Sequence, residues 1–446
     1  MISPADAEGR ATWTQDRGAF FLPNIDDDLE QCPVAADDGS QLSDVELASC
    51  NDAADDVVNG DEDVADLARI AVQPVDTTAV QSVHVELLGV GAAKTRVFVN
   101  TGTGADAADW VALSPDGTLP GELVGAGVEL GIEGKDIIRD SSWDGSVKVR
   151  VTHLDATAAV IAADEVEMRA TPLLFQTDLM PIRQLFAADN ATSVYAGRGE
   201  IEPTASTQRT RLTAVPFQAD IRAGVARINQ DVEFKLLPSL EGARGGGTGT
   251  DVWAQDIMEP GFMTLATPEG EHGMAVFVRA PVRDGRDNGG VNPFRQTGRV
   301  IFTELRGRDV AGVQHFDPDY VPAAPTGNSS YDTFGSTGNY GTVPPHRSDG
   351  IDYPVGRKLF GSVDGYTADP SFNAMLMAQG FQDPIVVNTS WLRVGHIDEV
   401  VSFIPANNKL GWAMVAADPQ LGFDLLRRLR DEGRGDEPLL NAYGFN

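Results

Sequence analysis

The sequence predicts a multidomain α+β protein, with an immunoglobulin-like β-sandwich over residues 1–180 and a domain of alternating strands and helices over residues 181–446. A chain of 446 residues is long enough for two or three domains with a substantial core. Between residues 69 and 172, short alternating or apolar runs are separated by Gly, Pro and Asp turns, as in a β-sandwich. Beyond residue 180 the apolar periodicity alternates between strand-like and helix-like.

Composition narrows the class of protein. A hydrophobic fraction of 42% and a mean hydropathy of -0.17 are typical of a soluble globular protein. No apolar run approaches a membrane span, and residues 1–6 lack the basic start and apolar core of a signal peptide. The 66 acidic and 34 basic residues give a net charge of -32. Nucleic acid and anionic membranes are therefore poor partners, while cations and basic polypeptides are expected ones.

The densest acidic region lies near the N-terminus, between about residues 12 and 66. After a short apolar strand, Asn24, Asp26 and Asp28 alternate, so an extended or looped backbone aims their oxygens in one direction. Asp63 and Asp66, three residues apart, could close a shared cage of oxygen ligands for a hard divalent ion. Without an ion these carboxylates repel one another, although an isolated Asp-rich loop is more often solvated than metal-bound.

The chain has two cysteines, Cys32 and Cys50, and both belong to this acidic region. They would pair if the protein is exported, and two free thiols are equally compatible with the sequence.

The remaining elements are predicted from periodicity and turn residues. Strands are expected at Val83–Leu88, Thr95–Val99, Val147–Thr152, Ala159–Ile161, Arg211–Val215 and Val232–Leu236. Helices are expected at Asp220–Gln230 and Phe423–Arg430, and the Gly-rich segment Gly242–Thr250 is expected to be mobile.

The stretch from Trp391 to Glu399 carries an imidazole and a carboxylate two residues apart. On an extended backbone, His396 and Asp398 would project from the same face. The flanking segments Ile385–Val387 and Val400–Ile404 are predicted to be short buried strands. For a lone His-x-Asp pair, a core histidine satisfied by the neighbouring aspartate is the more common explanation.

A second polar stretch changes that balance. Trp253, Gln255, Asp256 and Glu259 provide an aromatic face, an amide and two carboxylates within one short segment. Asp256 would supply a carboxylate opposite Asp398. A guanidinium is planar, binds carboxylates at two points and stacks on aromatic faces, so these groups together suit a guanidinium ligand.

These two stretches, Trp-x-Gln-Asp-x-Met-Glu and Trp-Leu-x-Val-Gly-His-x-Asp-Glu-x-x-Ser-Phe, resemble the catalytic domain of the protein-arginine deiminases. The segment from Tyr353 to Gly361 matches as well, and the resemblance covers nearly the whole chain. It implies a partial α/β propeller built of ββαβ units for residues 181–446. It also implies calcium-dependent hydrolysis of peptidyl-arginine to peptidyl-citrulline and ammonia.

The resemblance implies a role for each residue of the site. Asp256 and Asp398 would hold the guanidinium, and His396 would act as general acid and then as general base. Substrate contacts are expected from Trp253, Val394 and Arg283. For Arg283 the match is loose, and a surface-exposed arginine is an equal alternative.

Calcium is the cofactor that the resemblance implies. Ligands in the acidic region would be Asn24, Asp26, Asp28, Asp52, Asp55, Asp63 and Asp66. Ligands near the guanidinium site would be Gln255, Glu259 and the carbonyl of Phe334. Val57 and Ile257 stand where the family offers acids, and residues 338–340 lack one, so some of these sites are expected to be weakened or absent. Gln255 and Glu259 could instead brace Asp256.

The nucleophile is missing from this pattern. A deiminase attacks with a thiolate, its cysteine lies near the C-terminus in this family, and no cysteine follows Cys50. The chain is therefore expected to be a C-terminally truncated deiminase that is inactive as it stands. The alternatives are a calcium-binding pseudoenzyme or arginine-peptide binding module, and an amidinotransferase or free-arginine deiminase. Arginine-containing proteins or peptides are the expected partners, a homodimer is left open, and the location is cytoplasmic by resemblance or secreted if a signal peptide is missing.

Overall fold

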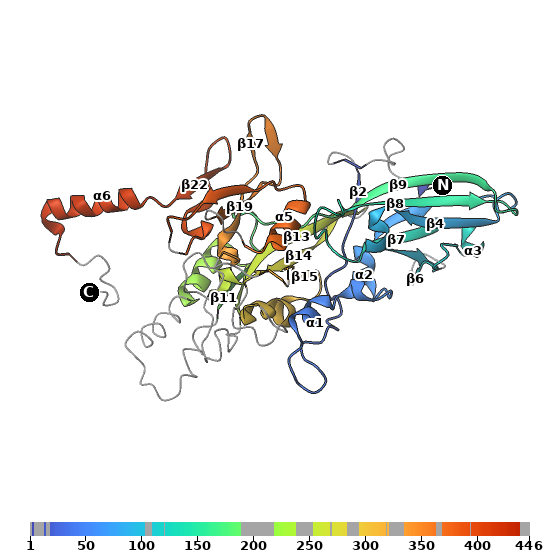
Figure 1. Ribbon diagram of the computed structural model, residues 1–446, viewed down its shortest axis with the longest axis horizontal. Coiled ribbons are helices and arrows are strands. Elements are labelled where there is room, and N and C mark those ends of the chain that lie inside the picture. The colour runs from blue at the N-terminus through green and yellow to red at the C-terminus, as the bar shows by residue number, and fades with distance from the viewer. Residues whose placement is uncertain are drawn as a thin grey trace.

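The computed structural model describes residues 2–3, 13–14, 18–102, 109–119, 121–188, 218–237, 253–267, 270–282, 294–317, 319–320, 334–362, 368–392 and 394–437. These residues form a mixed α+β structure that is rich in strands and divided into several small sheets (Figure 1). The predicted mixture of strands and helices is confirmed at this level. Closure into a propeller stays a prediction.

Two sheets face each other in the first part of the chain, which runs from β1 to β9. One has the order β1 (Ile2–Ser3), β3 (Ala68–Val72), β7 (Val128–Gly134), β5 (Thr95–Asn100) and β6 (Trp110–Ala112). The other has the order β2 (Ala19–Phe21), β9 (Val160–Ala170), β8 (Ser146–Leu154) and β4 (Ser82–Leu88). Strands predicted from periodicity thus appear as β4, β5, β8 and β9.

The two sheets enclose a common apolar core. Along β8 every second residue is buried, which is the period of a strand with one face on a core. The buried side chains of both sheets, such as Leu130 and Val149, belong to one continuous cluster. The result is a two-layer β-sandwich. Its immunoglobulin-type classification and its boundary at residue 180 stay predictions.

The acidic region forms short helices: α1 (Asp44–Ser49), a 3₁₀ turn (Asp52–Ala54) and α2 (Asp61–Asp66). Val64 of α2 packs against the sandwich, whereas Leu47 of α1 packs with apolar residues of the second part of the chain. A further helix in the sandwich is α3 (Gly121–Val124). Helix α1 begins with a capping box, in which the Ser43 hydroxyl accepts from the Glu46 amide and the Glu46 carboxylate accepts from the Ser43 amide. Such a box satisfies two amides that a helix start otherwise leaves without partners.

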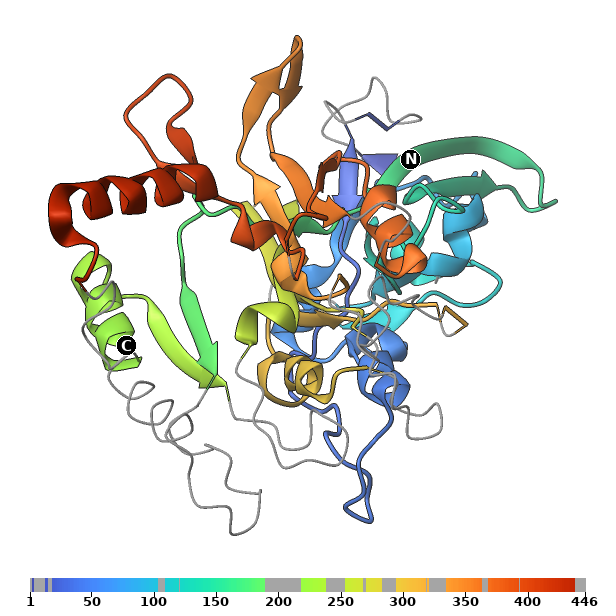
Figure 2. The same cartoon turned by 60° about the vertical axis from the view of Figure 1, so that its left-hand side comes forward.

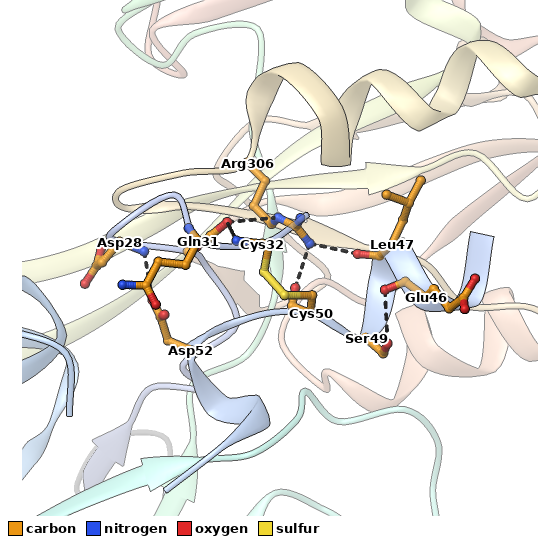
Figure 3. Close-up of a disulfide and its surroundings, with 10 residues drawn as sticks. Asp28, Gln31, Cys32, Glu46, Leu47, Ser49, Cys50, Asp52 and Arg306 are labelled. Carbon is orange, nitrogen blue, oxygen red and sulfur yellow. Dashed lines mark hydrogen bonds and ion pairs between the residues drawn. A yellow bond between two sulfur atoms is a disulfide. The ribbon is translucent and has the colours of Figure 1, made fainter. Parts of the chain in front are cut away.

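A disulfide closes the loop that contains α1. Cys32 and Cys50 are bonded, with their Cα atoms 5.7 Å apart, so the paired alternative holds (Figure 3). Arg306, from the second part of the chain, donates to the carbonyls of Leu47 and Cys50 at 2.7 and 2.6 Å. The disulfide loop is therefore anchored to the second part.

The second part of the chain, from β10 onwards, contains several small sheets. The largest has the order β10 (Leu174–Phe175), β13 (Met258–Thr267), β14 (Gly270–Arg279) and β15 (Val310–Val313). Another has the order β16 (Tyr340–Val343), β19 (Arg357–Ser362) and β20 (Ile385–Asn388). The pairs are β11 (Gln184–Ala188) with β12 (Glu233–Leu237), β17 (His346–Ser348) with β18 (Ile351–Tyr353), and β21 (Val401–Pro405) with β22 (Trp412–Ala416).

Helices in this part are a π-helical turn (Ile301–Leu305), α5 (Pro370–Ala378) and α6 (Pro419–Leu429), and residues 218–228 are also helical. The predicted strand at β12 and the two predicted helices are confirmed. The predicted strand Arg211–Val215 and the Gly-rich segment Gly242–Thr250 lie outside the described residues. Helix α6 extends from the body at the end opposite the sandwich (Figures 1 and 2). Among the helices that the structure describes, none has the length and apolar character needed to cross a membrane.

The two strands that flank the His396 stretch differ from the prediction in their burial. They form as β20 and β21, but Val386 is 53% and Ile404 47% exposed. In the part of the chain that the structure describes, β20 pairs on one side with β19 and β21 pairs with β22 alone. Each therefore lies at the edge of a small sheet, and the prediction that both are buried is wrong.

Lys358, on β19, is an ionisable side chain enclosed by apolar packing. It is 2% exposed, and its Nζ lies 5.5 Å from the centre of the Phe175 ring. Among the described residues this nitrogen has no hydrogen-bond partner. Burial, only partly opposed by the charge of Asp383, lowers the pKa of Lys358 to about 7.

Replacing Lys358 with Met should therefore stabilise the protein in a pH-dependent way. Between pH 7 and 10.5 the unfolded chain holds the Lys358 proton more tightly than the native state does. The free-energy cost of burying Lys358 is therefore largest at low pH and shrinks as pH rises. We expect Lys358→Met to raise the free energy of unfolding by about 2–4 kcal/mol at pH 6.5 and by less at pH 9.5. Urea denaturation at both pH values measures this. The control is Lys409→Met, at an exposed lysine. An equal gain at both pH values would contradict the prediction.

Candidate functional site

Three of the predicted site residues surround one point in space. Gly338 lies in a 3₁₀ turn (Thr337–Asn339), and a Cβ atom added there would lie 2.8 Å from Asp398 Oδ2, 2.8 Å from His396 Nδ1 and 2.9 Å from Asp256 Oδ1. His396 Nδ1 and Asp256 Oδ1 are 3.6 Å apart. Segments that are far apart in sequence thus bring two carboxylates and an imidazole together, and the glycine leaves the space between them open.

The backbone around His396 is not the expected strand. Ile397–Glu399 forms a 3₁₀ turn, with His396 as the last extended residue before it. The Glu399 carboxylate accepts from the amides of Gly395 and His396 at 3.2 and 3.1 Å, which favours a turn over a strand. The prediction of an extended backbone is therefore wrong, although both side chains still reach the same point.

Burial and neighbouring charge shift the pKa of Asp398. Desolvation raises this pKa most, the charges of Asp256 and Glu399 raise it further, and His396 opposes the shift. The anionic form of Asp398 is therefore less favourable here than in water. A cation bound beside it would remove that penalty, which suits a site that takes a positively charged ligand.

Asp256 has a partner that the sequence analysis missed. It lies in a 3₁₀ turn (Ala254–Asp256), and its Oδ2 is 3.4 Å from Nη1 of the buried Arg295. Arg295 belongs to none of the recognised motifs, and only the tertiary structure places it here. Asp256 is thus held with one oxygen toward Arg295 and the other toward His396.

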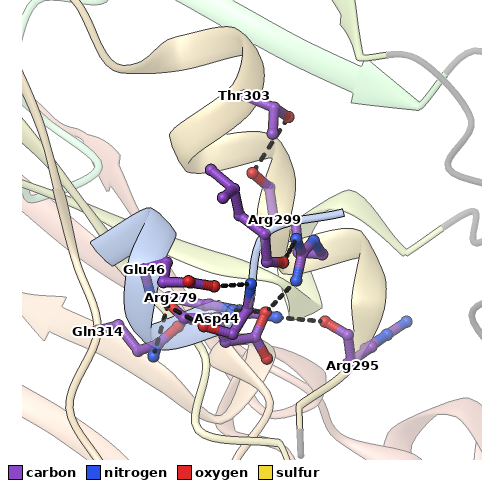
Figure 4. A network of polar contacts seen from close by, with 9 residues as sticks. Asp44, Glu46, Arg279, Arg295, Arg299, Thr303 and Gln314 are labelled. Carbon is purple, nitrogen blue, oxygen red and sulfur yellow. Dashed lines mark hydrogen bonds and ion pairs between the residues drawn. The ribbon is translucent and has the colours of Figure 1, made fainter. Parts of the chain in front are cut away.

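Arg295 is in turn held by a buried network that reaches the acidic region (Figure 4). Its carbonyl accepts from Arg279 Nη2 at 3.0 Å. Asp44, in α1, pairs through Oδ1 with Arg279 at 2.9 Å and with Arg299 at 2.7 Å. A charge-assisted bond of this kind is short and directional. The network therefore connects the disulfide loop to the segment that carries Asp256.

Of the three residues predicted to contact the substrate, the structure describes two, and both are exposed. Trp253 is 57% exposed and immediately precedes the turn that holds Asp256. Val394 is also exposed and immediately precedes Gly395, whose positive φ of 89° suits a residue without a Cβ. Arg283 lies outside the described residues. Its predicted role therefore stays a prediction.

The predicted ligands near this site also differ in their surroundings. Glu259 is buried, its Oε2 has no hydrogen-bond partner among the described residues, and its pKa is raised well above the ordinary value by burial and then by Asp178 and Asp398. Gln255 is exposed, and its backbone carbonyl accepts a hydrogen bond from the Thr337 hydroxyl at 2.6 Å. The structure thus favours a ligand role for Glu259 over one for the side chain of Gln255.

The Phe334 carbonyl, predicted as a ligand, already accepts a hydrogen bond. Its donor is Asn339 Nδ2, at 3.2 Å, and the same amide group also donates to Gly361. A carbonyl has two lone pairs, and this bond uses one of them. Asn339 occupies the segment where an acid was expected and stabilises the backbone of the site instead.

A second group of polar side chains gathers in the acidic region. Asp26 is 0% exposed, and neither of its carboxylate oxygens has a hydrogen-bond partner among the described residues. Burial, followed by the charges of Asp66, Asp28 and Asp52, raises the pKa of Asp26 well above its ordinary value. Burial, followed by the charges of Asp66 and Asp52, raises the pKa of Asp28 to about 7, and burial raises that of Asp52 to about 6. Unpaired buried carboxylates in one place fit a divalent cation with oxygen ligands.

The other predicted ligands of this region are satisfied in different ways. Asn24 Nδ2 donates to Asp63 at 2.6 Å and to Glu133 at 3.1 Å. Asp63 also accepts from the Asn59 amide at 2.5 Å. Asp55 is exposed and accepts from the amide of Val57. The structure thus groups Asp26 and Asp28 closely, with Asp52 beside Asp28, places Asp66 in a neighbouring group, and leaves Asp55 at the surface.

Two residues of the second part complete this cluster and were not predicted. His272 Nε2 lies 2.6 Å from Asp66 Oδ1. Asp309 groups with Asp66 and His272 on one side and with Asp26 and Asp28 on the other, with ligand atoms within 4.8 Å of one another in each group. His272 and Asp66 are 206 positions apart, so no local pattern could reveal the contact.

Comparison with known proteins places these sites in context. A family profile described as "Protein-arginine deiminase (PAD)" matches residues 160–444. Human protein-arginine deiminase type-4 is 24% identical over 472 aligned residues, which cover 99% of this chain and 59% of that protein. Mouse protein-arginine deiminase type-1 is 31% identical over 169 residues, 35% of this chain and 25% of the relative. Mouse inactive protein-arginine deiminase type-6 is 31% identical over 118 residues, 24% of this chain and 17% of the relative. This chain thus spans 59% of the length of the human type-4 relative.

The buried carboxylates predict a pH-dependent stability in the presence of a chelator. Because the pKa of Asp28 rises from 3.8 to about 7 on folding, its contribution is complete below pH 3.8 and is lost as pH rises toward 7. We expect Asp28→Asn to raise the free energy of unfolding by about 1–3 kcal/mol at pH 7.5 and to change it little at pH 4. Denaturation in EDTA measures this, with the exposed Asp56→Asn as the control. A loss of stability at pH 7.5 in EDTA would show that Asp28 is not repelled by its neighbours.

Proposed function

The chain belongs to the protein-arginine deiminase family, and on that premise we propose that residues 1–446 bind the guanidinium of a peptidyl-arginine for hydrolysis to citrulline and ammonia. One observation carries the proposal: the carboxylates of Asp256 and Asp398 and the imidazole of His396 meet around the single point above Gly338. We also propose the division into a sandwich domain, residues 1–180, and a catalytic domain of propeller type, residues 181–446.

The chemistry follows from the charges and positions of these groups. Asp256 and Asp398 accept from the guanidinium nitrogens, and this two-sided grip orients the central carbon for attack. The cation also relieves the unfavourable burial of Asp398. His396 protonates the departing ammonia and then takes a proton from the water that hydrolyses the intermediate. Trp253, at the exposed edge, packs along the aliphatic stem of the substrate.

Nucleophilic attack needs a thiolate that residues 1–446 do not provide, because both cysteines of the sequence are in the Cys32–Cys50 disulfide. We propose that a cysteine of polypeptide outside these residues attacks the guanidinium carbon. The carbon–nitrogen bond then breaks as ammonia leaves, and water cleaves the resulting thioether to release citrulline and regenerate the thiol. The same disulfide supports a second candidate function, a module that binds arginine peptides without turning them over.

Calcium is the cation that we propose for the acidic cluster. Asp26, Asp28 and Asp309 are the residues that would hold it, with the charge of Asp66 nearby, and Glu259 would serve near the guanidinium site. A bound ion would neutralise the mutual repulsion of these carboxylates and fasten the sandwich to the second part. The unpartnered oxygens of Asp26 support this assignment.

The guanidinium grip can be tested by binding. Isothermal titration of residues 1–446 with benzoyl-arginine amide should show binding that falls at least about 10-fold in Asp256→Asn and in Asp398→Asn, because each loses a charge-assisted bond. Asp418→Asn, at the exposed start of α6, serves as the control. Gly338→Ala should also lose binding, since its Cβ would fill the shared space. Unchanged affinity in both aspartate variants would contradict the site.

Turnover separates the two candidate functions. Citrulline should form only when residues 1–446 are joined to, or mixed with, a cysteine-bearing segment of the same family, and it should disappear in His396→Gln with binding retained. Colorimetric detection of citrulline measures this. Binding without citrulline in the completed protein would favour the binding module.

Calcium dependence is tested by thermal unfolding. Adding 5 mM Ca²⁺ to chelator-treated protein should raise the Tm by about 5 °C or more, since an ion that binds the native state alone stabilises it. Asp26→Asn combined with Asp28→Asn should remove most of that rise, whereas Asp37→Asn, at an exposed carboxylate, should keep it. No calcium response in the unaltered protein would remove calcium from the proposal.

A further inference from the structure

Lys358 and Thr342 bring two buried polar atoms to the same face of one small sheet. They are directly opposed residues of the antiparallel strands β19 and β16. Opposed side chains of such strands project from the same face, with their Cβ atoms about 4.5–5.5 Å apart. Lys358 is 2% and Thr342 4% exposed. Neither Lys358 Nζ nor Thr342 Oγ1 has a hydrogen-bond partner among the described residues.

The surroundings of these two atoms are aromatic. The Phe175 ring, from β10, is centred 5.5 Å from Lys358 Nζ. Tyr340 and Phe360 are the next opposed pair on the same face, with ring centres 5.7 Å apart. Gln382 holds Phe175 in place, because its side chain accepts from the Phe175 amide and donates to the Phe175 carbonyl. Aromatic faces attract a cation, but they do not replace the water that a buried ammonium loses.

The positive charge of Lys358 lacks a full counter-charge within this enclosure. The charge of Asp383 opposes only part of the effect of burial on Lys358. An ammonium has three donors and no acceptor, and the hydroxyl of Thr342 has one further donor. A water molecule accepts from both groups but brings no negative charge. A small anion accepts from both donors and also neutralises the ammonium, so an anion fits this pair better than water does.

We propose that Lys358 and Thr342 bind a small monovalent anion of the halide type, enclosed between β16, β19 and the Phe175 ring. The ammonium and the hydroxyl both donate to the anion. Strand β16 directly follows the turn that contains Gly338, and β19 pairs in parallel with β20, which leads towards His396. The anion thereby stabilises the sheet that supports the segments carrying Gly338 and His396. The site depends neither on the proposed function nor on calcium.

Thermal unfolding at pH 6.5 tests the proposal, with calcium supplied at a fixed concentration as its gluconate salt. At constant ionic strength, replacing gluconate with chloride should raise the Tm of the unaltered protein by about 3 °C or more, since an ion that binds the native state alone stabilises it. Lys358→Met removes the charge, so the rise should be lost. Thr342→Val removes the hydroxyl and should reduce the rise. Lys409→Met, at an exposed lysine, should keep the full rise.

Urea denaturation gives a second readout from the same variant. Because the anion lowers the cost of burying the ammonium, the gain in the free energy of unfolding from Lys358→Met at pH 6.5 should be smaller in chloride than in gluconate. An equal gain in both salts would show that chloride does not act on Lys358, and the proposal would fail.

Bromide locates the anion directly. Crystals of residues 1–446 soaked in sodium bromide should show an anomalous difference peak within hydrogen-bond distance of Lys358 Nζ and Thr342 Oγ1, and crystals of Lys358→Met should not. The absence of a peak beside Lys358, or the same rise of Tm with chloride in Lys358→Met as in the unaltered protein, overturns the proposal. A peak that persists in Lys358→Met marks an adventitious ion only and overturns it as well.

Discussion

Buried negative charge is the constraint on which the rest of this structure depends. A carboxylate withdrawn from water must find a cation or hydrogen-bond donors, or else shift its pKa and take up a proton. The chain meets this constraint in two ways. Asp44 receives the guanidinium groups of Arg279 and Arg299, whereas Asp26 and Asp66 keep buried oxygens that no described residue satisfies. In the first arrangement the protein itself supplies the positive charge, and we propose that a bound cation supplies it in the second.

The contacts of Asp44 with buried arginines also help to position Asp256. Asp44 orients Arg279, Arg279 holds the carbonyl of Arg295, and the side chain of Arg295 pairs with Asp256. Each bond involves a charged group in a buried setting, where such bonds are strong and directional. The position of the Asp256 carboxylate is therefore connected, bond by bond, to a short helix in the acidic region.

Prediction from the sequence succeeded where local patterns determine structure. The strand period found β4, β5 and β8, and the amphipathic pattern found α6. The motif residues Asp256, His396 and Asp398 also meet in space. It failed where distant residues decide the outcome. Arg295, His272 and Asp309 join their sites through contacts that no local pattern records, and the Glu399 carboxylate turns the backbone that was expected to be extended. Burial of β20 and β21 was also predicted wrongly, because periodicity does not report which sheet edge a strand occupies.

The disulfide has a consequence that reaches beyond its own loop. Asp44 lies within the segment that Cys32 and Cys50 close, and Arg306 fastens the same segment through the carbonyls of Leu47 and Cys50. Reduction of the bond would widen the range of conformations open to that segment, and so weaken the hold of Asp44 on two buried guanidinium groups. The redox state of the surroundings thereby becomes a determinant of how rigidly the carboxylate of Asp256 is held.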